Sequence, residues 1–320
     1  MSKKVVYITG CLGFIGSAIT EQCLERGFFV KGVDKMTYAA NKPLLEKFKS
    51  HSNFSFVHAD INDLKFLYDC DYIINTAAET HVGNSIVSSD EFVRSNIDGV
   101  HNILKLLKNY RAENRDKPVL LHFSTDEVMG DIQEGSFNEE ALLRPSNPYS
   151  ATKAAADMLI MAMGRTYELP YVIVRPSNNY GIGQYTEKLI PKTVKYLSLG
   201  KKISLHNGGT PVRTWLHVKD TSAAIMQILD NNIREGIYNI SGDEHYENLY
   251  VVRQILNIYF SRNVENYTDF LDLEYKRAGQ DIRYSVDDSK IRKLLNWKPV
   301  HNLNGSLPEV VEYYKKNFIW

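Results

Sequence analysis

Tyr149 and Lys153 form a pair of side chains that could act together in proton transfer. They stand four positions apart in the segment 149–167, which reads as a helix, so their side chains share one face. A nearby ammonium favours the phenolate form of a tyrosine, and such a tyrosine can accept a proton from an alcohol near neutral pH. The alternative is an ordinary solvated helix face, because this spacing often arises by chance.

A second chemical signal is the run Ser124-Thr125-Asp126-Glu127, which follows the apolar stretch 119–123. Ligands bind beyond the carboxyl ends of the strands in a doubly wound sheet, so two adjacent carboxyl groups at that edge would face a ligand. Their mutual repulsion can keep one of them protonated near neutral pH, which suits one acid and one base. The alternative is a solvated loop with a turn or a helix cap.

The N-terminal glycines form a third signal. Gly10, Gly13 and Gly16 lie in a G-x-x-G-x-x-G pattern between the apolar stretch 5–9 and a helical pattern. Glycines at these places allow a tight turn, the approach of a pyrophosphate and close packing of helix on strand, while the helix N-terminus supplies amide donors. Asp34, 18 residues after Gly16, ends the second predicted strand, where a carboxylate accepts hydrogen bonds from ribose hydroxyls and repels a 2′-phosphate. We therefore predict a dinucleotide site that prefers NAD to NADP.

An alternation of strands and helices is needed to bring these groups together. Short runs rich in β-branched and aromatic residues, typical of buried strands, alternate with helical patterns in the first half of the chain. This order predicts a Rossmann-type, doubly wound parallel sheet of the α/β class. The predicted strands are 5–9, 29–34, 54–58, 72–74, 119–123 and 171–175, and the predicted helices are 14–26, 92–110 and 149–167.

The strand and helix rhythm loosens after Pro176, where glycine-containing loops and shorter strands follow. We predict two domains on this basis. The first is an NAD-binding Rossmann domain over 1–176, to which a segment near 211–235 returns. The second is a smaller C-terminal α/β domain for the substrate over 177–320.

The composition excludes several classes of protein. The 320 residues include 38 Lys and Arg and 38 Asp and Glu, a balance that does not suit a nucleic-acid-coating protein or a polybasic membrane binder. No apolar run reaches the roughly 18 residues of a membrane span. The three cysteines are too sparse for a disulfide framework or a zinc site. We predict a cytoplasmic protein with no metal site and no nucleic-acid or membrane partner.

Together these motifs resemble those of the extended short-chain dehydrogenase/reductases, and within them the nucleotide-sugar 4,6-dehydratases of the dTDP-glucose 4,6-dehydratase kind. The Thr-Asp-Glu triplet is the specific part, because related epimerases and decarboxylases usually lack it. The resemblance covers nearly the whole chain. Matching segments lie at 10–16, 33–39, 60–61, 77–82, 124–128, 175–181, 187–191, 277–284 and 296–299.

The resemblance implies roles for the residues in these motifs. The residues implied for catalysis are Thr125, Asp126, Glu127, Tyr149 and Lys153. Those implied for the cofactor NAD are Gly10, Gly13, Phe14, Ile15, Gly16, Asp34, Lys35, Thr37, Asp60, Ile61, Ala77, Ala78, Asn96, Tyr149 and Lys153. Those implied for a nucleotide-diphospho-glucose substrate are Thr80, Thr125, Asn179, Glu187, Lys188, Leu189, His206, Arg213, Asn248, Arg277 and Tyr284, the arginines being suited to grip phosphate through paired donors.

The implied enzyme is a hydro-lyase of deoxysugar biosynthesis that acts on dTDP- or UDP-glucose. Tyr149, helped by Lys153 and Thr125, removes the 4-hydroxyl proton while hydride passes from C4 to NAD. Glu127 then takes the C5 proton and Asp126 protonates the departing C6 hydroxyl, after which hydride returns to C6 and a proton to C5. The helices 92–110 and 149–167 are implied to pair with their copies in a homodimer, although the sequence equally allows them to be buried within one chain.

Two other functions stay open at this point. One is a nucleotide-sugar 4-epimerase or decarboxylase with the same fold, and the other is a non-catalytic NAD-binding sensor. The chain departs from the family pattern at Met129, His206 and Gln280. These departures leave the preference for thymine or uracil open.

Overall fold

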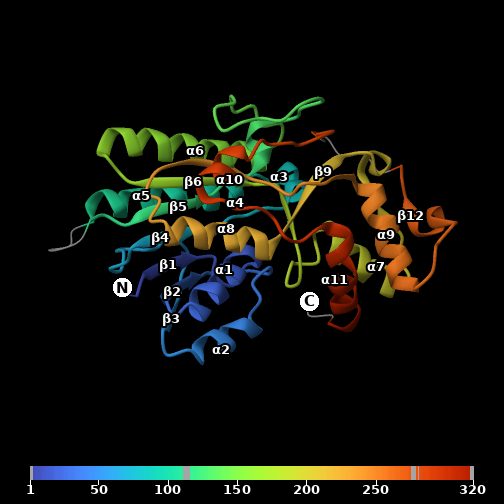
Figure 1. Cartoon of the computed structure of the whole chain (residues 1–320), viewed down its shortest axis with the longest axis horizontal. Coiled ribbons are helices and arrows are strands. Elements are labelled where there is room, and N and C mark those ends of the chain that lie inside the picture. The colour runs from blue at the N-terminus through green and yellow to red at the C-terminus, as the bar shows by residue number, and fades with distance from the viewer. Residues whose placement is uncertain (1–2, 111–115, 275–278, 280, 318–320) are drawn as a thin grey trace.

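A seven-stranded parallel sheet forms the centre of the computed structural model, which describes residues 3–110, 116–274, 279 and 281–317 (Figure 1). The strand order is β10-β6-β5-β4-β1-β2-β3, and it reverses direction between β1 and β4. This doubly wound arrangement confirms the predicted fold class. The strands are β1 (Val5–Thr9), β2 (Phe29–Asp34), β3 (Phe54–His58), β4 (Tyr72–Asn75), β5 (Val119–Phe123), β6 (Tyr171–Pro176) and β10 (Gly236–Ile240).

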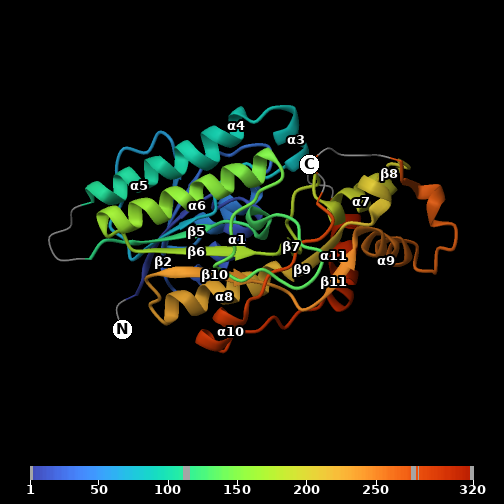
Figure 2. The same ribbon diagram turned by 90° about the horizontal axis from the view of Figure 1, so that it is seen from above.

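Helices cover both faces of this sheet, which is why its strands are apolar on both sides. Val6 and Ile8 of β1 belong to one core cluster, with α1, α2, α8 and α10, while Tyr7 between them belongs to another, with α5 and α6. Figures 1 and 2 show α5 and α6 side by side on one face. The helices are α1 (Phe14–Glu25), α2 (Pro43–Lys49), α5 (Gly99–Asn109), α6 (Pro148–Tyr167), α8 (Val218–Asp230) and α10 (Ser289–Leu295).

The helix predicted over 92–110 is interrupted. It consists of α4 (Asp90–Val93), a π-helical turn (Arg94–Asp98) and α5. A π turn contains more residues per turn than an α-helix, so it shifts the buried face. Ser95 and Asn96 are therefore buried, whereas Val93, which lies within the predicted helix 92–110, is 41% exposed.

The seventh strand comes from the second half of the chain. The predicted return segment near 211–235 contains α8, which packs against α1, but the strand that follows it, β10, begins at Gly236. β10 pairs in parallel with β6, and α10 packs against it. The sheet thus extends beyond the predicted return segment, and the division into domains 1–176 and 177–320 stays a prediction.

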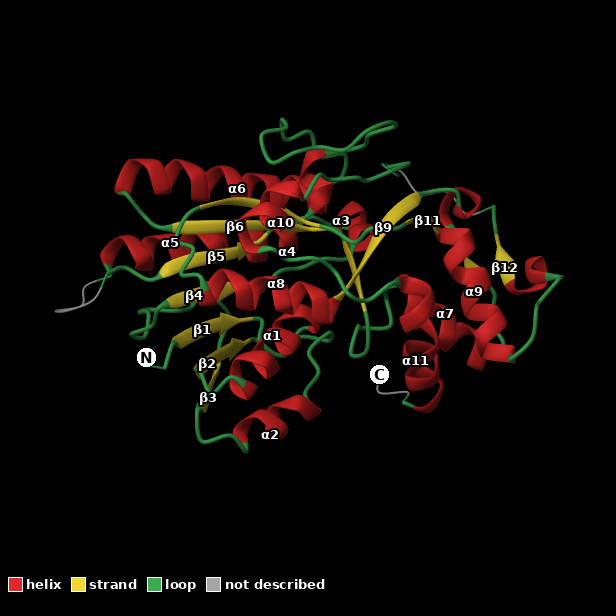
Figure 3. Cartoon of the chain, viewed as in Figure 1, coloured by secondary structure: helices red, strands yellow, loops and turns green. Residues whose placement is uncertain are grey.

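A second core lies beside the carboxyl end of the large sheet (Figure 3). It is formed by three helices around two small sheets, of order β11-β9-β7 and β12-β8. Among the described helices, none combines the length and the apolar character of a membrane span. The remaining elements of the described chain, not all of which belong to this core, are α3 (Val82–Val87), β7 (Asn178–Tyr180), α7 (Leu189–Ser198), β8 (Ile203–Ser204), β9 (Val212–His217), β11 (His245–Glu247), α9 (Asn248–Phe260), β12 (Leu271–Asp272), α11 (Leu303–Lys316) and 3₁₀ turns at Asp126–Met129, His206–Gly209 and Tyr267–Phe270.

Candidate active site

The glycine loop between β1 and α1 packs closely against the end of β4. Gly10 has φ of 69°, and a Cβ there would lie 2.8 Å from the Ala77 amide nitrogen. A Cβ on Gly16 would lie 2.1 Å from the Gly10 carbonyl oxygen, so neither position accepts a side chain without movement. Gly13 precedes α1, and no described side chain caps this helix. The amides of its first turn are therefore available to a phosphate, which fits a dinucleotide.

Asp34 lies at the end of β2 beside this loop and is almost buried. Its Oδ2 accepts a hydrogen bond from the Leu12 amide at 3.0 Å, and its Oδ1 accepts one from the Met36 amide at 2.7 Å. Burial raises the pKa of Asp34, and these two amides oppose the rise. The pocket around it is also lined by the predicted residues Gly10, Gly13, Lys35, Thr37, Asp60, Ile61, Ala77 and Ala78.

Asn96 does not line the pocket in which we expected it to contact the cofactor. Its side chain is completely buried. The amide oxygen accepts from the Glu79 amide at 2.9 Å, and the amide nitrogen donates to the Glu79 carbonyl and to Thr152 Oγ1, both at 3.0 Å. Asn96 thus holds the loop after β4 against α6 instead of facing the pocket.

Tyr149 and Lys153 occupy the first turns of α6, whose start is set by a capping box. Asn147 Oδ1 accepts from the Ser150 amide at 3.0 Å, and Ser150 Oγ accepts from the Asn147 amide at 3.3 Å. Lys153 Nζ donates to the carbonyl of Phe123, the last residue of β5. Tyr149 and Lys153 therefore lie beside the segment that carries Thr125, Asp126 and Glu127, and all five residues line one pocket with Phe14 and Ile15.

Burial dominates the protonation of this pair. Burial lowers the pKa of Lys153 to about 8, although the Asp157 carboxylate opposes it. Burial and the Glu127 carboxylate raise the pKa of Tyr149, and a hydrogen bond with Thr125 acts the other way. The expected phenolate is therefore not favoured by the protein groups alone, and a further positive charge is needed in the pocket.

Asp126 and Glu127 differ in their surroundings. Asp126 is buried, and desolvation together with the Glu127 carboxylate raises its pKa to about 7. Thr125 Oγ1 donates to Asp126 Oδ1 at 3.2 Å, while Oδ2 has no hydrogen-bond partner among the described residues. Glu127 is half-buried and accepts from the Tyr284 hydroxyl at 3.4 Å. The arrangement suits Asp126 as a proton donor and Glu127 as a proton acceptor near neutral pH.

Arg213 has fewer open donors than we expected for a phosphate ligand. Its Nη1 donates to the carbonyls of Val212 at 2.7 Å and Ile282 at 3.3 Å, and its Nη2 donates to that of Asp281 at 3.1 Å. The guanidinium also lies 4.3 Å from the centre of the Tyr284 ring. Three of the five N–H groups of an arginine are thus directed at backbone carbonyls.

The pocket of the acid pair continues toward the smaller sheets. Thr80, Glu127, Asn179, Glu187 and Lys188 line both this pocket and a neighbouring one between the two cores. The other predicted substrate residues that line the neighbouring pocket are Leu189, His206, Arg213, Asn248 and Tyr284. Arg277 and Gln280 lie outside the described residues.

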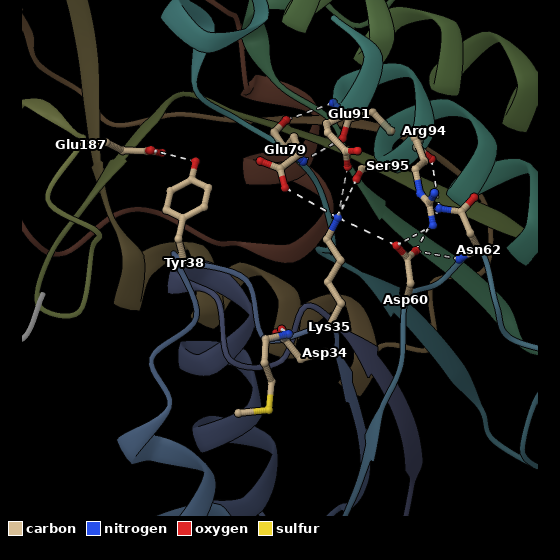
Figure 4. A network of polar contacts seen from close by, with 12 residues as sticks. Asp34, Lys35, Tyr38, Asp60, Asn62, Glu79, Glu91, Arg94, Ser95 and Glu187 are labelled. Carbon is tan, nitrogen blue, oxygen red and sulfur yellow. Dashed lines mark hydrogen bonds and ion pairs between the residues drawn. The ribbon is translucent and has the colours of Figure 1, made fainter. Parts of the chain in front are cut away.

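Some residues at the site escaped the sequence analysis. Asp157, one turn after Lys153, accepts from Ser124 Oγ at 3.0 Å and from Arg175 at 3.1 Å, and this buried group joins α6 to the ends of β5 and β6. Glu79 and Ser95 meet Lys35 at the edge of the cofactor pocket (Figure 4). The one available signal was the position of Glu79 shortly after a buried strand, where side chains reach the ligand edge of a sheet.

Comparisons with known proteins identify the family of the chain. The chain matches the family described as GDP-mannose 4,6 dehydratase over residues 7–310. It is 36% identical to the dTDP-glucose 4,6-dehydratase of Neisseria gonorrhoeae, over 98% of this chain and 96% of that protein. It is 37% identical to a low-salt glycan biosynthesis protein of Haloferax volcanii, over 97% of this chain and 98% of that protein. The crystal structure of DesIV, a dTDP-glucose 4,6-dehydratase from Streptomyces venezuelae with NAD and TYD bound, superposes with a TM-score of 0.90 at 33% identity and covers 98% of this chain and 97% of DesIV.

The doubly wound sheet, the glycine loop and the Tyr149/Lys153 pair define the class of extended short-chain dehydrogenase/reductases. Within that class, the chain belongs to the GDP-mannose 4,6 dehydratase family. The predicted resemblance to nucleotide-sugar 4,6-dehydratases is therefore confirmed.

Proposed function

We propose that this protein is a lyase that removes water from a nucleotide-diphospho-glucose in an NAD-dependent reaction and forms the 4-keto-6-deoxy sugar. The observation that carries the proposal is the placement of Asp126 and Glu127 in one pocket with Tyr149 and Lys153. Oxidation of the sugar hydroxyl needs the Tyr149/Lys153 pair. Elimination of water from the neighbouring carbons needs the Asp126/Glu127 pair. The activity named for the relatives and the NAD bound to DesIV support the same reaction.

The glycine loop, the N-terminus of α1 and Asp34 would hold NAD, which supplies a hydride acceptor and a positively charged ring when bound. A positive charge in the pocket lowers the pKa of Tyr149, which can then take the proton of the 4-hydroxyl. Glu127 takes the proton from C5 once C4 is a ketone, because the ketone acidifies that position. Asp126, whose pKa is raised to about 7, carries a proton in a substantial share of the molecules near neutral pH and gives it to the departing C6 hydroxyl.

The neighbouring pocket would hold the nucleotide diphosphate of dTDP- or UDP-glucose. Lys188 and Arg213 bring positive charge to its walls, and His206 and Asn248 offer polar groups to the base. Arg213 contributes mainly its charge, because backbone carbonyls engage three of its donors.

Two alternatives predict different products. A 4-epimerase or decarboxylase of nucleotide sugars needs no acid and base at C5 and C6, so the Asp126/Glu127 pair would be idle. A non-catalytic sensor needs neither this pair nor Tyr149 and Lys153.

The deciding experiment follows deuterium. With dTDP-glucose or UDP-glucose deuterated at C4, we expect a product that is lighter by one water and carries the label at C6. In heavy water, unlabelled substrate should gain deuterium at C5 and none at C6. Mass spectrometry and proton NMR of the sugar measure both. Label retained or returned at C4 would indicate an epimerase, and the absence of turnover with NAD bound would indicate a sensor.

We also propose that the protein is a cytoplasmic homodimer that pairs through α5 and α6. These helices lie side by side on one face of the sheet (Figure 2). The outer surface of α6 carries Ala151, Ala155, Met158 and Ala162, which are exposed or half-buried and recur at helical spacing. An apolar stripe of this kind suits packing against a second helix pair.

A further inference from the structure

Lys35 is surrounded by carboxyl groups at the edge of the cofactor pocket (Figure 4). Its Nζ lies 3.7 Å from Glu79 Oε1, 3.9 Å from Asp60 Oδ2 and 4.0 Å from Glu91 Oε2. It also donates to Ser95 Oγ at 3.1 Å. The four groups come from three separate segments of the chain, near residues 60, 79 and 91–95, so the fold directs the ammonium toward this cluster.

The acidic partners of Lys35 differ in exposure. The side chains of Asp60 and Glu79 are only 15% and 17% exposed, whereas that of Glu91 is 68% exposed. Burial acts against charge on Asp60, but hydrogen bonds from Asn62 and the charges of Lys35 and Arg94 outweigh it and lower the pKa. Screening by water is weakest for the partly buried groups, so Asp60 and Glu79 act most strongly on Lys35.

Without these carboxyl groups, Lys35 would favour the binding of NADP at this site. It follows Asp34, the residue expected at the ribose hydroxyls, and lines the same pocket. A free ammonium in that position would bind a 2′-phosphate, because charge-assisted hydrogen bonds to phosphate are strong. Asp34, Asp60, Glu79 and Lys35 all line this pocket, so three carboxyl groups there oppose one ammonium among the described residues.

We propose that Glu79, with Asp60, is a specificity-determining residue that holds the Lys35 ammonium and so disfavours NADP at this site. The inference rests on the proposed function, since it concerns the dinucleotide used there. Asp34 repels the 2′-phosphate directly. Glu79 acts indirectly, because it pairs with the Lys35 ammonium that would otherwise bind the 2′-phosphate.

The test compares the dissociation constants of NAD and NADP by calorimetry with the full-length protein. In Glu79→Gln, we expect the affinity for NADP relative to NAD to rise roughly tenfold or more, because the freed ammonium forms a charge-assisted hydrogen bond. Glutamine has nearly the same shape, and the backbone of Glu79 keeps its hydrogen bonds with Asn96. Glu91→Gln is the matched control on the same lysine, and its exposure predicts a clearly smaller rise.

The double variant Lys35→Met/Glu79→Gln separates this mechanism from a general loss of negative charge. We expect it to lose the gain of Glu79→Gln, because the ammonium is gone. Two results would overturn this proposal and leave NAD binding intact. One is an unchanged affinity for NADP relative to NAD in Glu79→Gln, and the other is an equal rise of that relative affinity in the double variant. Wild-type protein that binds neither dinucleotide would overturn the proposed function and this inference together.

Discussion

Asp126 combines near-complete burial with a neighbouring carboxylate. Desolvation and Glu127 together raise its pKa from 3.8 to about 7, and Arg213 and Thr125 only partly oppose them. The same environment that makes Asp126 a proton donor near neutral pH makes its charged form costly in the folded protein. A site for general acid catalysis therefore carries a measurable cost in stability.

We predict that Asp126→Asn abolishes this cost. The folded protein binds the Asp126 proton more tightly than the unfolded chain, so this residue makes the free energy of unfolding fall as the pH rises from about 4 to about 7. Asparagine does not titrate. Between pH 4 and pH 8, the stability of Asp126→Asn relative to wild type should therefore rise by up to roughly 4 kcal/mol. Urea unfolding at both pH values measures this difference.

Glu127→Gln provides the control for that prediction. Without the Glu127 charge, the pKa of Asp126 should fall, and the pH range in which stability is lost should move downward. A stability difference between Asp126→Asn and wild type that does not vary with pH would contradict the assigned protonation.

At the scale of elements, two glycines in the turn from β1 to α1 meet different requirements. Gly16 is needed for packing, and Gly13 is needed for binding. A Cβ on Gly16 would lie 2.1 Å from the Gly10 carbonyl oxygen and 2.5 Å from Thr76 Oγ1. A Cβ on Gly13 would meet only the Gly10 carbonyl oxygen, at 3.2 Å, within the described residues. Both glycines line the pocket.

We predict that the two alanine variants fail in different ways. Gly16→Ala forces α1 away from β1 and β4 and should lower the free energy of unfolding by about 1–3 kcal/mol. Gly13→Ala should leave stability nearly intact but weaken NAD binding, since a methyl group would stand where the pyrophosphate approaches the backbone. Thermal unfolding without ligand and calorimetric titration with NAD distinguish the two. Equal loss of stability in both variants would refute the separation.

At the scale of the whole molecule, α6 serves two surfaces. Its inner side carries Tyr149 and Lys153 into the pocket, and its outer side carries the apolar stripe that includes Met158. Pairing of two chains through α5 and α6 would leave the pocket of each chain on the opposite side of that helix. The dimer would then stiffen the helix that positions the proposed base.

Met158→Glu tests this pairing. Met158 is 58% exposed, and a charge there would have to be buried in the proposed interface, so we expect a dimer to become a monomer. Light scattering at micromolar concentration measures the mass. Leu294→Glu is the control, because Leu294 is 52% exposed on α10, a helix that packs on the other face of the sheet. A monomeric wild-type protein, or dissociation by both variants, would count against the proposed interface.

Local patterns in the sequence were sufficient for much of the fold. Four of the six predicted strands keep their bounds, and β4 and β6 extend one residue further. These strands are recognisable because β-branched and aromatic runs between glycines and helical patterns are local signals. The glycine loop, Asp34 and the Tyr149/Lys153 pair were found for the same reason, since each motif lies within a few residues or at a set distance along one βαβ unit.

Contacts between side chains that are far apart in the sequence depend on the packing of the whole chain. Tyr284 and Glu127 are 157 positions apart in the sequence, and no local pattern predicts their hydrogen bond. The π turn placed Asn96 inside the protein, although the local pattern predicts one continuous helix over 92–110. Lys35, next to Asp34, is predicted to contact the cofactor. Its acidic partners come from three other segments, which only the packed chain brings to it. Local sequence patterns thus define the elements and the chemical groups that they carry. Burial and long-range contacts, which exist only in the packed chain, set the charges and orientations of those groups.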